Sequence, residues 1–280
     1  MNVRKNSGEL VPFDSASLKR SLDRSGASKN QVEAVFEDVC AHLYEGISTR
    51  EVYQFAFESL RTHRNVFAAR YSLKRALKDL GPEGFYFEKW VGKLFKSYGY
   101  ETTTGKTLQG KAVTHEIDVV ALKDGELHLI ECKFRNDESA KISVTTPMYF
   151  MSRMKDLSEQ TFDFFNQHLQ PKKGWLITNA FLTSDSVKFI ETYQMNALSW
   201  DYPEKYGLKH RTDDRGLYPI TCLTTMNHLQ KEQLLKADCI LVQELVKQPT
   251  ILNKLNIHPE DRRNVLEECM ELLKGISSHK

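Results

Sequence analysis

The chain has 280 residues, 40% hydrophobic and 27% charged, an ordinary composition for a globular protein with room for two or three domains. Its net charge of +2 gives no argument for nucleic-acid binding, so a basic groove would have to come from local arrangement. Five scattered cysteines without a Cys-x-x-Cys pair argue against a disulfide framework or zinc knuckle. With no signal core and no run of about 18 apolar residues, we expect a cytoplasmic protein without membrane contact.

Residues 1–80 are predicted to form one small, mainly helical unit. Residues 3–13 read as a β-hairpin, and either Asp14 or Ser15 is placed to cap the helix that follows. Apolar periodicity then predicts three further helices, over residues 31–44, 49–60 and 66–80. A Gly-Pro pair directly after this unit marks its end.

Residues 83–205 alternate helix and strand, which predicts an α/β core with helices on both sides of a central mixed sheet. The expected elements are a helix over 85–98, a hairpin within 115–134, a helix around 147–165, a strand over 174–179, a helix over 184–193 and a strand around 197–200. Gly105-Lys106-Thr107 lacks the spacing and the following helix of a phosphate loop, so we expect an exposed polar turn. A polar linker over 211–216 leads to a helical module over 216–280.

The most informative local pattern is the hairpin around Asp124-Gly125, a dipeptide typical of two-residue turns. With these residues as the loop, Asp118 lies opposite Glu131, and Glu116 lies opposite Lys133. Facing like charges about 5 Å apart destabilise a sheet, and apolar residues on both faces are typical of a buried, central hairpin. Two buried carboxylates without a structural reason therefore indicate a bound cation. The alternative is a solvated, charged end of the sheet.

Asp118 followed by Glu131-Cys132-Lys133 resembles the Asp…Glu-x-Lys pattern of the PD-(D/E)XK nuclease superfamily, and most closely its Mrr-like restriction endonuclease branch. The resemblance covers about residues 83–205. It implies a restriction-endonuclease-like α/β/α fold and hydrolysis of DNA phosphodiester bonds with Mg²⁺ or Mn²⁺. It also implies that Asp118, Glu131 and the backbone carbonyl of Cys132 hold the metal, while Lys133 orients the attacking water and stabilises the developing charge.

Two further residues are implied by the same resemblance. Glu88 is similar to the helical glutamate that assists the metal in this family, although a residue at the solvent edge of its helix is the alternative. Gln160, expected within the helix around 147–165, matches a glutamine of Mrr-like enzymes, and Phe164 stands where a tyrosine follows it there. A surface glutamine is the alternative for Gln160.

Residues 1–80 resemble an ATP-cone, a small regulatory domain that binds nucleotides. The matching residues include Val3–Gly8, Val11–Asp14 and Ala69–Tyr71. The resemblance implies binding of ATP or dATP with Lys5 at the phosphates. Ser17 stands where the family has a lysine, and Lys19 and Arg20 are the next cations along the chain. A cone that serves only for docking or dimerisation is the alternative.

Together these patterns predict a metal-dependent DNA endonuclease with an N-terminal nucleotide-sensing domain, acting in restriction, phage defence or DNA repair. The partners expected are DNA, a second copy of the chain in a homodimer, and a protein of a defence system. Two alternatives stay open: a catalytically silent regulator that binds nucleic acid or a partner, and an RNA nuclease. The presence of Asp118, Glu131 and Lys133 together favours an active enzyme.

Overall fold

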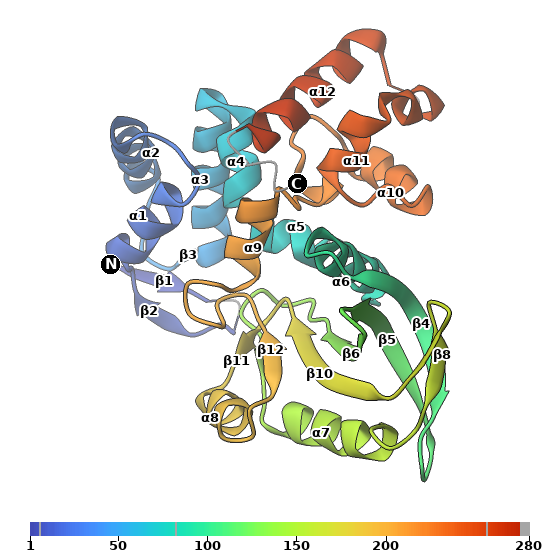
Figure 1. Ribbon diagram of the computed structural model, residues 1–280. Coiled ribbons are helices and arrows are strands. Elements are labelled where there is room, and N and C mark those ends of the chain that lie inside the picture. The colour runs from blue at the N-terminus through green and yellow to red at the C-terminus, as the bar shows by residue number, and fades with distance from the viewer. Residues whose placement is uncertain (6, 82, 256, 275–280) are drawn as a thin grey trace. The chain divides into compact units, whose positions relative to one another are not determined.

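A computed structural model describes residues 1–5, 7–81, 83–255 and 257–274 (Figure 1). Residue 6 in the predicted N-terminal hairpin and the proline that ends the first unit lie outside this range, as do the last six residues of the predicted C-terminal module. The described residues divide into two compact units. The first unit holds residues 1–73, 222–233 and 245–274, and the second holds residues 74–221 and 234–244. The chain beyond residue 216 thus contributes to both units, and the three-domain division over 1–80, 83–205 and 216–280 stays a prediction.

Short strands and four helices begin the first unit. The strands are β1 (Asn2–Arg4), β2 (Leu10–Pro12) and β3 (Ile47–Ser48). The helices are α1 (Ser15–Asp23), α2 (Lys29–Ala41), α3 (Thr49–His63) and α4 (Asn65–Tyr71). β1 pairs antiparallel with β2, which confirms the hairpin, and parallel with the unexpected β3. Asp14 caps α1 by accepting a hydrogen bond of 2.9 Å from the Ser17 amide.

The C-terminal part of the first unit is helical. It contains η2 (Pro249–Lys254) and α12 (Pro259–Leu273), while α10 (His228–Lys236) and α11 (Val242–Lys247) each cross a unit boundary. α12 packs against α4, where Arg64 forms an ion pair of 2.5 Å with Glu271. None of the helices in the described residues is long and apolar enough to cross a membrane.

A five-stranded mixed sheet forms the centre of the second unit, counted over the described residues. In spatial order it consists of β12 (Asn196–Leu198), β10 (Pro171–Thr178), β6 (Glu126–Lys133), β5 (Thr114–Lys123) and β4 (Glu101–Gln109). β4, β5 and β6 are antiparallel, whereas β6, β10 and β12 are parallel. The predicted hairpin is therefore at the centre of the sheet, as its two apolar faces indicate.

Helices cover both faces of this sheet, which gives the α/β/α layers expected from the sequence (Figure 1). The helices of this unit are α6 (Phe85–Ser97), α7 (Thr145–Leu157), α8 (Ser184–Thr192) and α9 (Leu208–Arg215), and most of α5 (Leu73–Lys78) belongs to it as well. α6 packs on β4, β5 and β6. On the other face, Leu157 of α7 joins Val120 and Leu129 in one apolar cluster, and Phe150 joins Leu176 of β10 in another.

Three expectations for this region are wrong. The helix around 147–165 ends at Leu157 and gives way to a small hairpin of β8 (Phe162–Phe164) and β9 (Gln167–Leu169). Gly105-Lys106-Thr107 lies within β4 rather than in a turn, because this polar stretch pairs with β5 as the edge of the sheet. The predicted linker over 211–216 is mostly the end of α9, which stops at Gly216 with a left-handed φ of 62°.

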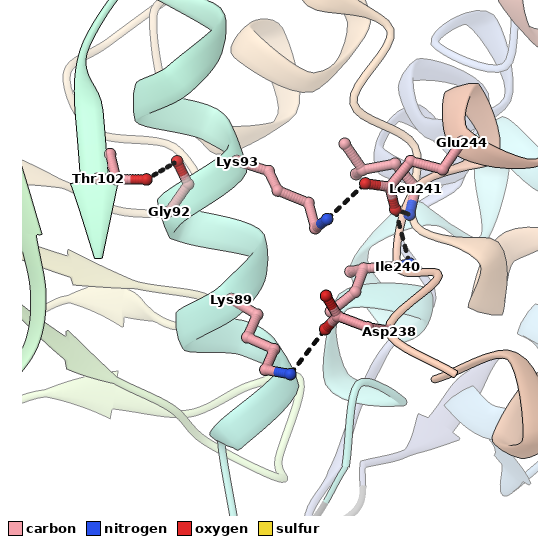
Figure 2. Close-up of polar contacts among 8 residues, drawn as sticks. All are labelled: Lys89, Gly92, Lys93, Thr102, Asp238, Ile240, Leu241 and Glu244. Carbon is pink, nitrogen blue, oxygen red and sulfur yellow. Dashed lines mark hydrogen bonds and ion pairs between the residues drawn. The ribbon is translucent and has the colours of Figure 1, made fainter. Parts of the chain in front are cut away.

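A segment far along the chain anchors α6 (Figure 2). Lys89 on this helix forms an ion pair of 2.6 Å with Asp238, and Lys93, one turn later, pairs with Glu244. Glu244 also accepts backbone hydrogen bonds of 2.8 and 3.0 Å from the two residues before α11. The same carboxylate therefore caps α11 and holds α6, the helix that carries Glu88.

We expect replacement of Glu244 by alanine to lower the free energy of unfolding of the second unit by about 2 kcal/mol, because charged hydrogen bonds at a helix start and an ion pair are lost together. Urea unfolding followed by tryptophan fluorescence measures this unit, since Trp90, Trp175 and Trp200 all lie in it. Glu204→Ala, at an exposed position of the same unit, is the control. Equal midpoints for the two variants would contradict the anchoring role.

Candidate nuclease site

The β5–β6 hairpin has the register that its sequence predicts. Asp124 and Gly125 form the turn with φ values of 52° and 76°, and the pairs run from Lys123 with Glu126 to Val119 with Ile130. The pairing of β5 with β6 ends at Val119 and Ile130. Asp118 and Glu131, the next residues on each strand, were expected to face each other and lie directly beyond this last pair. Asp118 instead accepts a hydrogen bond of 2.6 Å from the backbone amide of Cys132.

Carboxylates from three elements, β5, β6 and α6, influence one another at this end of the hairpin. Burial, and then the charge of Glu131, raises the pKa of Asp118 to about 6 against the opposing hydrogen bond from Cys132. Glu88 reaches the same region from α6. Burial raises its pKa to about 7, and the neighbouring negative charges of Asp118, Glu116 and Glu131 add to the effect. Glu88 is half-buried, and its role in the site stays a prediction.

Arg153 of α7 is the site residue that sequence reasoning missed. Its guanidinium donates hydrogen bonds to the side chain of Glu131 and to the backbone carbonyl of Glu116. Only 8% of Arg153 is exposed. It supplies a positive charge beside Glu131, and it also lowers the pKa of Asp118. The signal was present, because Arg153 stands between Phe150 and Leu157 on the apolar stripe of its helix, where an unpaired arginine would be costly.

The donor set fits a hard divalent cation. Mg²⁺ usually takes one or two protein carboxylates and keeps several waters, and Asp118 and Glu131 supply two. Burial, followed by the nearby carboxylates, raises the pKa of the Cys132 thiol well above its usual value, so a thiolate ligand from this residue is not expected. Within the described residues, no group of three or more His, Cys, Asp or Glu side chains would hold a metal by side chains alone.

Lys133 and Gln160 differ in how the structure places them. Lys133 is the last residue of β6, two positions after Glu131, and its carbonyl accepts a hydrogen bond of 2.5 Å from Thr178 of β10. Its side chain therefore belongs to the same strand face as the Glu131 carboxylate.

Gln160 does not lie in a helix, because α7 ends at Leu157. It lies just after the end of α7, and its backbone amide donates a hydrogen bond of 3.0 Å to the Leu157 carbonyl. Its role in the site stays a prediction.

The candidate nucleotide residues lie in the first unit. Lys5 pairs with Glu9 at 3.0 Å, and Lys19 pairs with Glu33 at 2.8 Å. Arg20 lies 3.8 Å from Asp14. Exposed ion pairs of this kind contribute about 0–1 kcal/mol each, so a phosphate can displace the carboxylates at little cost.

The raised carboxyl pKa values predict how the metal-free protein responds to pH. The folded state keeps protons on Asp118 and Glu88 that the unfolded state has lost, so stability falls as pH rises from about 4 through 7. We expect Glu88→Gln to be more stable than the natural protein at pH 8 in EDTA, and the difference to disappear near pH 4. Urea unfolding at the two pH values measures this.

Glu83→Gln, which removes an exposed carboxylate shortly before α6, is the matched control and should follow the natural protein at both pH values. If the stability of Glu88→Gln and of the natural protein depended on pH in the same way, the pKa of Glu88 would not be raised in the folded state.

Comparison with protein families divides the chain into three matches. Residues 1–80 match the ATP cone domain, residues 81–201 match the restriction endonuclease domain of Mrr type, and residues 218–273 match the C-terminal region of AF1548-like proteins. The first two matches confirm the order of domains expected from the sequence. They also confirm the fold class, a mixed α/β restriction-endonuclease-like domain with helices at both ends of the chain.

Among curated proteins, an uncharacterised protein of Archaeoglobus fulgidus is 30% identical over 184 residues, which are 65% of this chain and 99% of the relative. Among solved structures, a protein of unknown function, AF1548, is 28% identical with a TM-score of 0.55, covering 68% of this chain and 98% of that one. Can2 from Sulfobacillus thermosulfidooxidans, solved with cyclic tetra-adenylate, is 16% identical with a TM-score of 0.34, covering 70% and 54%.

Proposed function

The chain belongs to the family of its Archaeoglobus fulgidus relative, and we propose that it is a Mg²⁺-dependent endonuclease that hydrolyses DNA phosphodiester bonds. In this chain an ATP-cone domain precedes the restriction endonuclease domain. The observation that carries the proposal is the mutual electrostatic influence of Asp118, Glu131 and Glu88 where the central hairpin ends, on the strand that Lys133 terminates. Carboxyl groups whose pKa is strongly raised by burial and by neighbouring charges cluster at functional sites.

Each residue has a role that follows from its position. Asp118, Glu131 and the carbonyl of Cys132 would hold the metal, which when bound supplies a water of lowered pKa and stabilises charge on the phosphate. Lys133, at the end of β6, orients the attacking water and stabilises the negative charge that develops on the phosphate oxygens. Glu88 would accept a hydrogen bond from that water, or from a water on the metal.

A nicking assay on supercoiled DNA with Mg²⁺ tests this proposal. Lys133→Met removes the ammonium and keeps a side chain of similar length, so we expect cleavage to slow by about 10²–10³-fold. Lys141→Met, at an exposed position of β7 (Lys141–Ile142), is the control and should cleave normally. Normal cleavage by Lys133→Met would remove this lysine from the mechanism. Parallel assays on single-stranded DNA and on RNA identify the substrate.

Nucleotide control through the N-terminal domain belongs to the same proposal. Its support is the family match over residues 1–80 and the weak ion pair that engages Lys5. ATP or dATP at 100 times its dissociation constant should stabilise the first unit by about 2.7 kcal/mol, and Lys5→Ala should remove most of that effect. If neither nucleotide changes the melting temperature or the rate of cleavage, the domain serves another purpose.

We also propose that the enzyme acts as a homodimer in restriction, phage defence or DNA repair, with a defence-system protein as a further partner. The support for a dimer is that cleavage of both strands of a duplex needs two active sites. Sedimentation on a duplex substrate measures it, and one chain per cleaved duplex would contradict it.

One observation favours a second candidate, a catalytically silent regulator that keeps the nuclease fold. Arg153 already neutralises Glu131, one of the two carboxylates that would bind the metal. Calorimetric titration with Mg²⁺ and Mn²⁺ separates the two candidates: a silent regulator would bind neither metal and would cleave no nucleic acid.

A further inference from the structure

A pocket of about 170 Å³ opens in the second unit between α6, the central sheet and α9. Its lining residues are Leu94, Phe95, Tyr98, Tyr100, Lys123, Trp175, Leu198 and Arg211. None of them belongs to the candidate nuclease site. Lys123 is five residues from Asp118 along β5, a separation of roughly 16 Å at the rise of a strand.

Aromatic rings form the walls of this pocket, and their mutual contacts hold them in place. Phe95 meets Trp175 edge to face, with ring centroids 5.5 Å apart, and meets Tyr100 in the same way at 5.2 Å. The indole nitrogen of Trp175 donates a hydrogen bond of 3.1 Å to Nδ1 of His128. Tyr98, Tyr100 and Trp175 remain half-buried, so parts of these rings face the pocket. Oriented, partly open rings suit a flat ligand.

Positive charges border the same pocket. The Lys123 ammonium donates a hydrogen bond of 2.8 Å to the Tyr98 carbonyl and lies 5.3 Å from the centre of the Tyr100 ring. The Arg211 guanidinium lies 5.3 Å from the centre of the Tyr98 ring, and Arg215 lies 4.4 Å from it. Among the described residues that line the pocket, none is acidic. The ligand is therefore expected to carry negative charge as well as a flat ring.

We propose that this pocket binds a nucleotide unit, with its base against the aromatic walls and its phosphate near Arg211 and Lys123. A cavity of about 150 Å³ accommodates benzene, so a pocket of about 170 Å³ has room for a single flat base. Base–aromatic stacking tolerates any base and is worth about 1–3 kcal/mol. The nucleotide unit comes either from a free mononucleotide or from single-stranded nucleic acid. Neither metal nor cleavage is required, so this inference does not depend on the proposed function.

Tryptophan fluorescence of the full chain in EDTA tests the inference, with adenosine monophosphate and single-stranded tetradeoxyadenylate as the two probes. Residues 1–80 contain no tryptophan, and of the three tryptophans Trp175 is the one that lines the pocket. Trp175→Phe should therefore lose most of the signal. We expect Arg211→Ala and Tyr98→Leu each to weaken binding about tenfold. Lys172→Ala, an exposed cation elsewhere in the unit, should bind normally. Circular dichroism checks that each variant is folded.

Tighter binding of the tetranucleotide would assign the pocket to a nucleic-acid strand, and equal or tighter binding of the mononucleotide would assign it to a free nucleotide. Both outcomes support the inference. It is overturned if neither probe gives a saturable change at millimolar concentration, or if Arg211→Ala binds as the natural protein does. Loss of binding in a variant that still nicks DNA separates this pocket from the nuclease site.

Discussion

Replacing Asp118 by asparagine is expected to reduce Mg²⁺-dependent cleavage by at least about 10³-fold. The substitution keeps the size of the side chain and removes the negative charge that would hold the metal, and such a metal contributes several kcal/mol to the transition state. Calorimetry should show a parallel loss of metal affinity. The measurement is the initial rate of nicking at saturating Mg²⁺ for the natural chain and the variant.

Asp124→Asn is the matched control, because it makes the same chemical change in the turn of the same hairpin. Asp124 has a positive φ, which asparagine tolerates well. This variant should fold and cleave as the natural chain does. If Asp118→Asn cleaved at the rate of the control, the assignment of Asp118 would be wrong.

Replacing Arg153 by methionine is expected to lower the free energy of unfolding of the metal-free protein by about 3–5 kcal/mol. The change leaves Glu131 without the cation that it pairs with, and an uncompensated buried charge costs about that much. The side chains of Arg153 and Glu131 are only 9% and 13% exposed, so water does not replace the lost contact. Urea unfolding in EDTA, followed by tryptophan fluorescence, gives the value.

Mg²⁺ should restore part of that stability, because a bound cation neutralises Glu131 in place of Arg153. The same variant therefore distinguishes a metal site from a purely structural ion pair. Lys155→Met, an exposed position on the same helix, is the control and should change stability by less than about 0.5 kcal/mol. A loss of stability in Arg153→Met that Mg²⁺ leaves unchanged would indicate that Glu131 serves the fold alone.

The central hairpin was predictable because the residues of its turn determine which residues of the two strands pair. Asp124-Gly125 specifies a two-residue turn, and the turn sets every pair from Lys123 with Glu126 to Val119 with Ile130. The approach of Asp118 and Glu131 follows from that register, since both residues stand directly beyond the last pair. The cap of α1 at Asp14 was equally local, because its carboxylate bonds an amide three residues away.

The features that were missed depend on contacts between distant residues or on weak local signals. β4 is an edge strand, so its polar residues show no apolar alternation, although its threonines favour a strand. Leu157 is followed by neither glycine nor proline, so the end of α7 had no clear mark in the sequence. The turn at Phe165 and Asn166, both with positive φ, then directs the chain into β9. Arg153 pairs with a carboxylate 22 residues away, which only the packing of α7 on the sheet determines.

A time course of supercoiled plasmid with the purified full chain, in Mg²⁺ and in EDTA, tests the central claim most directly. The proposed metal site of Asp118 and Glu131, with Glu88 and Lys133 in supporting roles, predicts that nicked and linear DNA accumulate with Mg²⁺ and that neither forms in EDTA. Cleavage that proceeds equally in EDTA, or no cleavage of DNA or RNA in either condition, would contradict a metal-dependent nuclease site at the end of this hairpin.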